Sequence, residues 1–152
     1  MKILLISLLA LFTLGTANMP AEVNNKDVTG VWKTIDDESG KAKSHVQIYK
    51  KSGKLYGKII KLYREPGEEA DPVCNDCPGN RKGKKIIGME IITGLEYRAD
   101  DKEWYADDAI LDPNNGKVYD CKIYLDSDNP DELKVRGYIG WVYRTQTWHR
   151  VR

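Results

Sequence analysis

The sequence predicts an all-β fold, an antiparallel up-and-down β-barrel of about eight strands, and three observations support this. Short runs that suit strands recur along the chain, and turn residues separate them. No helical period occurs after residue 18. The chain has nine Tyr and four Trp but one Phe, so its aromatics mostly carry a polar group that suits a barrel wall. Short connections make sequential strands pair antiparallel, and eight can close into a barrel, with a β-sandwich as the alternative.

The first half of the chain contributes four strands, which are expected over residues 28–35, 44–51, 54–63 and 86–98. Ser52-Gly53 is a two-residue turn of the kind that tight hairpins prefer. The fourth strand is expected to bend at Gly88 or Gly94, because Gly inside a strand marks a bulge or a close approach. Residues 64–85 are too long and too polar for a tight turn, which predicts a functional or stapled loop.

The second half shows clearer alternation, with strands expected over residues 104–111, 117–126, 133–141 and 145–151. The segment Asp112-Pro113-Asn114-Asn115-Gly116 is a strong turn signal between the first two of them. In the next two strands, one residue in two belongs to an apolar face, which indicates half-buried strands. These faces are Tyr119, Cys121, Ile123 and Leu125, and then Leu133, Val135, Gly137, Ile139 and Trp141.

The N-terminus predicts export. Residues 3–12 form an apolar run too short to span a bilayer, and Gly15-Thr16-Ala17 offers the small residues that a signal peptidase reads. We therefore expect a cleaved signal peptide at residues 1–17, a flexible segment at 18–27 and one barrel domain at 28–152. No Cys lies near the cleavage point, so no lipid or membrane anchor is expected. The predicted location is the periplasm or the exterior of a bacterial cell.

Charge narrows the range of partners. The chain has 24 basic and 23 acidic residues, and cleavage removes Lys2, so the mature chain has no formal net charge. Such a chain has no field to hold a polyanion, which argues against nucleic acid. It also has no basic arm for a membrane surface. The charges are mixed in sign along the sequence, as in a solvated exterior.

The cysteines predict a staple in the long loop. Outside the cytoplasm a Cys-x-x-Cys pair usually oxidises, so Cys74 and Cys77 are expected to form a disulfide. A redox site has the same spacing but places its first Cys at a helix N-terminus, and no helix is expected here. Cys121 lies on an apolar strand face and is interpreted as a free, buried thiol. The alternative is a bond from Cys121 to one of the other two.

The last two strands carry the polar residues of greatest interest for binding. Arg144, Gln146, Trp148 and Arg150 share one strand face by the two-residue period. If this face points inward, a bidentate Arg could hold a ligand carboxylate. Alternatively, the polar side chains face solvent or pair with Asp36, Asp37 or Asp108. The candidate ligand-binding residues are Arg136, Arg144, Gln146, Cys121 and Ile123.

No catalytic, metal or cofactor site is predicted. The sequence has no Gly-x-Ser-x-Gly elbow and no Gly-rich phosphate loop. His45 and His149 stand in expected strands without a nucleophile or a ligand spacing. The turn at 112–116 lacks the ligand alternation and closing Glu of a calcium loop. We therefore do not expect an enzyme.

Four segments, in order along the chain, give a resemblance to a known family. They are Gly30-Val31-Trp32-Lys33-Thr34, Cys74-Asn75-Asp76-Cys77, Ile110-Leu111-Asp112-Pro113 with Gly116-Lys117-Val118-Tyr119, and Leu133–Gly140 leading to Arg144–Arg150. The chain resembles the secreted bacterial family called domain of unknown function 2147. This resemblance implies a lipocalin-like, calycin-type barrel and no established activity. It also implies that Trp32 closes the narrow end beneath a last-strand cation, Arg150 first and Arg144 second.

Three classes of function are weighed on this fold. The leading hypothesis is a binding module that takes a small lipophilic or amphipathic molecule into the barrel. The alternative is a structural or interaction protein of the envelope with a filled barrel, whose protein partner is unknown. A Cys-x-x-Cys redox protein is a further alternative. The size of the inward side chains separates the first two, because a filled interior leaves no cavity.

Overall fold

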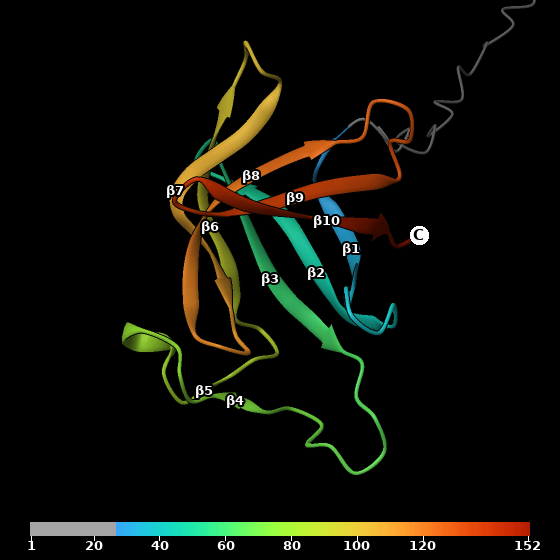
Figure 1. Ribbon diagram of the computed structural model, residues 1–152, viewed down its shortest axis with the longest axis vertical. Coiled ribbons are helices and arrows are strands. Elements are labelled where there is room, and N and C mark those ends of the chain that lie inside the picture. Colours follow the sequence, from blue (N-terminus) through green and yellow to red (C-terminus); the bar gives the residue numbers. More distant parts are fainter. Residues whose placement is uncertain (1–26) are drawn as a thin grey trace, which may run out of the picture.

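The computed structural model describes residues 27–152, and Figure 1 shows their strands wrapped into a barrel. The closed order is β1-β10-β9-β8-β7-β6-β3-β2, and each neighbouring pair is antiparallel. The predicted fold class is therefore confirmed. The bounds are β1 Gly30–Ile35, β2 Ala42–Lys51, β3 Lys54–Leu62, β6 Glu90–Arg98, β7 Glu103–Asp112, β8 Lys117–Leu125, β9 Glu132–Ile139 and β10 Val142–Arg150.

The predicted signal peptide, residues 1–17, lies outside the described residues. So does the expected segment 18–27, except for Asp27. No helix within residues 27–152 combines the length and the apolar composition needed to cross a membrane.

Turn chemistry sets the register of the hairpins. Lys51 pairs with Lys54 across Ser52 and Gly53, whose φ angles of 51° and 77° are both positive. Two consecutive positive φ angles define the turn whose twist matches that of the flanking strands, and Gly adopts them without strain. The predicted hairpin between β2 and β3 therefore forms at the expected place.

Two predicted strands need correction. The fourth begins at Glu90 rather than at residue 86, because Gly88, at φ 89°, turns the chain before it. Gly94 lies inside β6, where the pairing with β7 shifts register. The strand expected over 133–141 ends at Ile139, since Gly140 at φ 60° starts a two-residue turn. Trp141 therefore occupies this turn and does not belong to the inward face.

The long segment between β3 and β6 lies outside the barrel. It contains β4 (Val73–Cys74), a single 3₁₀ turn η1 (Gly79–Arg81) and β5 (Lys84–Lys85), and the two short strands pair with each other. Figure 1 shows it beneath the ends of β3 and of the β7–β8 hairpin. We call residues 64–88 the insert. The prediction of a long irregular loop here is confirmed, apart from the small sheet within it.

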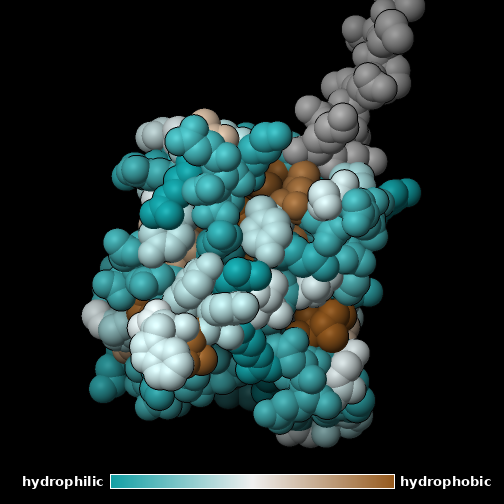
Figure 2. All heavy atoms as spheres, turned by 45° about the horizontal axis from the view of Figure 1, so that its top comes forward, coloured by the Kyte–Doolittle hydropathy of each residue, from teal (hydrophilic) through white to brown (hydrophobic). Residues whose placement is uncertain are grey.

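The core fills one half of the barrel. Trp32, Leu55 and Ile92 are fully buried there, and so are Leu95 and Ile123. The outer surface in the view of Figure 2 is mainly hydrophilic, with hydrophobic atoms in small separate patches. The filled half is the end that holds the β2–β3, β6–β7 and β8–β9 connections, and we call it the closed end. The opposite end is the mouth.

Candidate functional site

A cavity of about 390 Å³ opens at the mouth. Its inner wall is apolar, because Ile59, Val135 and Trp148 are buried there and point inward from β3, β9 and β10. The wall also takes in residues from the ends of β1, β6 and β7 and from the insert. The cavity thus uses the part of the barrel interior that the core leaves open.

A buried pair of hydroxyls interrupts this apolar wall. Thr34 on β1 and Ser44 on β2 are each 6% exposed, and their hydroxyl oxygens are 2.8 Å apart. The Ser44 backbone N–H also donates to the Thr34 oxygen at 3.1 Å. Both residues line the cavity. A ligand with one polar atom can exchange hydrogen bonds with this pair without leaving it unsatisfied.

A chain of polar contacts joins β10 to the β1–β2 loop across the mouth. The Trp148 indole N–H donates to Gln146 Oε1 at 3.1 Å, and Gln146 Nε2 donates to Asp37 Oδ2 at 2.7 Å. Arg144 forms an ion pair with the same Asp37 oxygen. We call Asp37, Arg144 and Gln146 the mouth triad. It holds the loop against β10 and presents exchangeable hydrogen-bonding groups at the cavity entrance.

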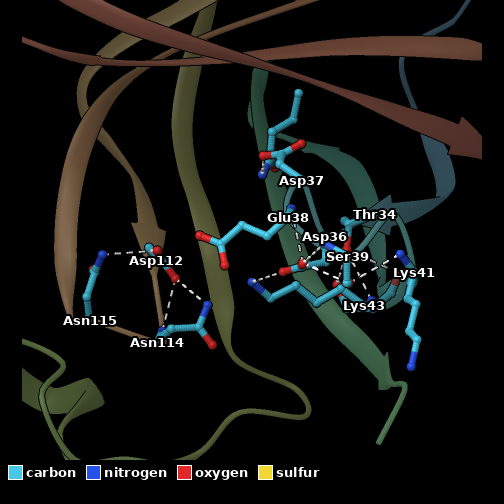
Figure 3. Close-up of polar contacts among 12 residues, drawn as sticks. Thr34, Asp36, Asp37, Glu38, Ser39, Lys41, Lys43, Asp112, Asn114 and Asn115 are labelled. Atoms are coloured by element: carbon cyan, nitrogen blue, oxygen red, sulfur yellow. Dashed lines mark hydrogen bonds and ion pairs between the residues drawn. The ribbon is translucent and has the colours of Figure 1, made fainter.

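The loop that carries Asp37 is built around its neighbour Asp36 (Figure 3). Asp36 Oδ1 accepts hydrogen bonds from the Ser39 backbone N–H and hydroxyl, each at 2.8 Å. The Ser39 backbone hydrogen bond is the largest cause of a lowered pKa for the Asp36 carboxyl. The charged carboxylate therefore orders this loop and with it the position of Asp37.

A second polar cluster in Figure 3 surrounds Asp112 in the β7–β8 turn. Asp112 Oδ1 accepts from the Asn114 backbone N–H at 3.0 Å and from its side-chain amide at 2.7 Å, and Asp112 Oδ2 accepts from Asn115 at 3.1 Å. Such bonds are those of an Asx turn, as the sequence predicts. In residues 27–152, no three His, Cys, Asp or Glu side chains form a group that could hold a metal ion.

The insert packs directly on this turn. Gly116 has φ 69°, and a Cβ placed on it would lie 2.0 Å from the backbone oxygen of Asp76. Asp76 lies between Cys74 and Cys77, which form a disulfide as predicted, and both cysteines are buried. The insert contributes Arg64 and Ile86 to the cavity. The disulfide therefore fixes a segment that forms part of the mouth.

The whole barrel and its insert match a known family. A family model described as an uncharacterized protein conserved in bacteria (DUF2147) matches residues 30–150. The chain belongs to this family.

The DUF2147 chain also matches a solved structure, protein HP1028 from the human pathogen Helicobacter pylori, which is described as belonging to the lipocalin family. The TM-score is 0.66 at 18% sequence identity, over 83% of this chain and 84% of that one. At this identity the match shows a shared lipocalin-like barrel. No curated protein matches the chain.

At the closed end of the DUF2147 barrel, Trp32 and Arg150 lie together at the seam between β1 and β10. Their Cα atoms are register partners, and the guanidinium carbon of Arg150 lies 4.2 Å from the centroid of the indole ring. Arg150 also donates to the backbone oxygens of Thr29, Asp27 and Pro130, at 3.1, 2.8 and 3.2 Å. The structure thus places a cation from the last strand over Trp32, as the family resemblance implies.

The candidate ligand-binding residues fall in three places. Arg144 and Gln146 line the cavity, and both contact Asp37, one of the partners that the sequence offered as an alternative. Cys121 and Ile123 point inward but lie in the filled core. Cys121 is a free thiol, and burial raises its pKa. Neither residue lines the cavity.

Arg136 needs correction as a candidate. It alternates with the cavity-lining Val135 and Gly137, so it lies on the outer face of β9. There its Nε donates to the Thr145 hydroxyl at 2.7 Å, and its guanidinium carbon lies 4.4 Å from the centroid of the Tyr143 ring. The two-residue period, counted from Leu133, already assigns Arg136 to the polar side.

Sequence reasoning missed the two cavity hydroxyls. The signal for them was present, because Thr34 is two residues from Trp32 and Ser44 two residues from Val46, on buried strand faces. It missed the contribution of the insert entirely, because no local pattern shows where a long loop returns to the barrel.

Proposed function

We propose that this protein binds a small, partly apolar molecule in the mouth cavity, with a polar end of the ligand at the mouth triad. The observation that carries the proposal is the cavity itself, whose 390 Å³ lies in the range of small-molecule sites. Burial of apolar ligand surface contributes roughly 25 cal/mol per Å². The hydroxyl pair and the triad then fix the orientation.

The two alternatives receive less support. A barrel filled from end to end would leave no cavity, whereas here the core fills only the closed end. A Cys-x-x-Cys redox protein needs an accessible sulfur for thiolate attack, but Cys74 and Cys77 are 1% and 2% exposed. We therefore propose a binding protein rather than an enzyme. The apolar run at residues 3–12 supports a site of action outside the cytoplasm.

Gly137 offers a direct test. It lines the cavity at an ordinary backbone conformation, and a Cβ there would meet only Tyr119 Cβ, at 3.8 Å. The series Gly137→Ala, Gly137→Val and Gly137→Leu should therefore fill the cavity stepwise without distorting the strand. Tyr138→Leu, at the next residue but on the outer face, is the matched control.

The measurement has two parts. Native mass spectrometry of wild type from its own organism should show a bound small molecule, which Gly137→Leu loses. In titrations with 1-anilinonaphthalene-8-sulfonate, affinity should fall along the series, while Tyr138→Leu binds like wild type. Asp37→Ala should weaken binding further by freeing the loop. Equal binding by Gly137→Leu and wild type would refute the proposal.

A further inference from the structure

The tip of the β9–β10 hairpin exposes apolar side chains that the barrel does not use. Ile139, Trp141, Val142 and Tyr143 are 64%, 93%, 55% and 58% exposed. Trp141 is the most exposed large hydrophobic side chain in residues 27–152. We call these four residues the tip. Isolated apolar residues on a surface are ordinary, but a contiguous group of this kind marks an interaction site.

The fold gives no reason for this composition. Gly140 at φ 60° and Trp141 form a two-residue turn, and polar residues such as Asn and Asp serve such turns at least as well. Trp141 has almost no contact with the barrel, so it adds little to folding. The tip therefore has to be explained by something outside the chain.

Two arginines flank the tip. Residues 136–145 contain Arg136 and Arg144 and no Asp or Glu. The Arg136 guanidinium stacks on the Tyr143 ring and donates to the hydroxyls of Thr145 and Tyr124, so its printed partners are all neutral. This arrangement presents a fixed cation beside exposed aromatic rings. It is the composition of a membrane interface, where Trp and Tyr lie at headgroup level and Arg meets phosphate.

The size of the tip argues against a protein partner. At about 200 Å² for a large side chain, its four partly exposed residues offer roughly 500 Å². A stable complex buries roughly 800 Å² on each partner. A narrow, convex apolar tip suits a bilayer better, because it can insert between headgroups without a complementary surface.

We propose that the tip inserts into the headgroup region of a bilayer that contains anionic phospholipid, with Trp141 as the anchor and Arg136 as the phosphate contact. Ile139, Val142 and Tyr143 also line the cavity, so the mouth then lies at the lipid surface. The contact is peripheral and reversible, since one hairpin tip buries little apolar area. It differs from the basic arm that the sequence lacks. The proposal does not depend on the cavity having a ligand.

The experiment uses vesicles of phosphatidylcholine alone and of phosphatidylcholine mixed with phosphatidylglycerol. Wild type should co-sediment with the mixed vesicles, and its tryptophan emission should shift to shorter wavelength. This shift reports Trp141, because Trp32, Trp104 and Trp148 are buried. Trp141→Ser should lower the partition coefficient by at least about tenfold. Trp141→Phe should retain most of the binding, and Arg136→Gln should reduce binding to mixed vesicles only.

Two controls separate the tip from other causes. Tyr97→Ser removes a 52% exposed aromatic at the closed end and should bind vesicles like wild type. Gly137→Leu fills the cavity and should also bind like wild type, so failure here and failure of the ligand proposal are distinguishable. Circular dichroism should show Trp141→Ser folded, since its side chain is 93% exposed in wild type.

Three results would overturn the proposal. They are no binding of wild type to either vesicle, unchanged binding by Trp141→Ser, and a dimer in sedimentation velocity that Trp141→Ser abolishes. The last would assign the tip to a second copy of the chain.

Discussion

Arg144 and Arg150 stand six residues apart on the same face of β10, yet the two ends of the barrel use them differently. The Arg150 side chain is 7% exposed, lies over Trp32 and donates to three backbone oxygens. The Arg144 side chain is 64% exposed and pairs with Asp37 on a loop. The same residue type therefore closes the barrel at one end and lines an opening at the other.

This difference shows how the work is divided within the barrel. The β1–β10 seam pairs only Trp32 with Arg150 and Lys33 with His149, so its strength depends on side chains. A stable closed end allows the mouth to keep a cavity, a loop latch and an insert without loss of the fold. Substitutions should therefore separate stability from binding according to the end that they affect.

The largest effect is expected at the seam. Trp32→Ala should lower the free energy of unfolding by about 3–5 kcal/mol, as for a large aromatic truncated in a core. Arg150→Ala should also destabilise, and the double variant should lose less than the sum of the two, because they interact directly. Urea unfolding measures all three. Strict additivity would contradict the proposed closure.

Arg144→Ala is the control from the opposite end. An exposed ion pair contributes about 0–1 kcal/mol, so this variant should unfold within that range of wild type. A loss comparable to that of Arg150→Ala would remove the contrast between the two ends.

An intermediate effect is expected where the insert meets the barrel. Gly116→Ala puts a Cβ against Asp76 at a positive φ, so the insert should move away from the β7–β8 turn. Cys77→Ser opens a short disulfide loop, which contributes little chain entropy. Hydrogen exchange should speed up within residues 64–88 in both variants and stay slow in β1 and β10. Global unfolding of either variant would show that the insert supports the whole barrel.

The sequence predicts the barrel better than the mouth, and the reason is the range of the interactions. Period-two alternation and turn residues are local, so the strands and the Ser52-Gly53 hairpin follow directly from them. Trp141 was misplaced because Gly140 can continue a strand or start a turn, and only the pairing of Ile139 with Val142 decides. The contact of Gln146 with Asp37 joins residues 109 positions apart, beyond any local pattern.

The smallest effect is expected in acid, and it again compares the two ends. Asp36 orders the mouth loop, and Asp126 orders the β8–β9 turn at the closed end. Hydrogen bonds from the backbone N–H of Ser39 and of Asp128, respectively, are the largest causes of their lowered pKa values. A lowered folded pKa means that each contribution is fully present above the ordinary value of 3.8 and is lost as pH falls through the folded pKa.

Both turns should therefore keep their structure down to about pH 4 and loosen below it. NMR titration of the Ser39 and Asp128 amides measures this, and midpoints at or above 3.8 would contradict it. Asp36→Asn keeps an acceptor oxygen and should remove the titration at Ser39. Because Asp37 follows Asp36, loosening at the mouth should also shift the side-chain amide of Gln146. The indole N–H of Trp32 should not respond when Asp126 titrates, because it donates to Val28 within the seam.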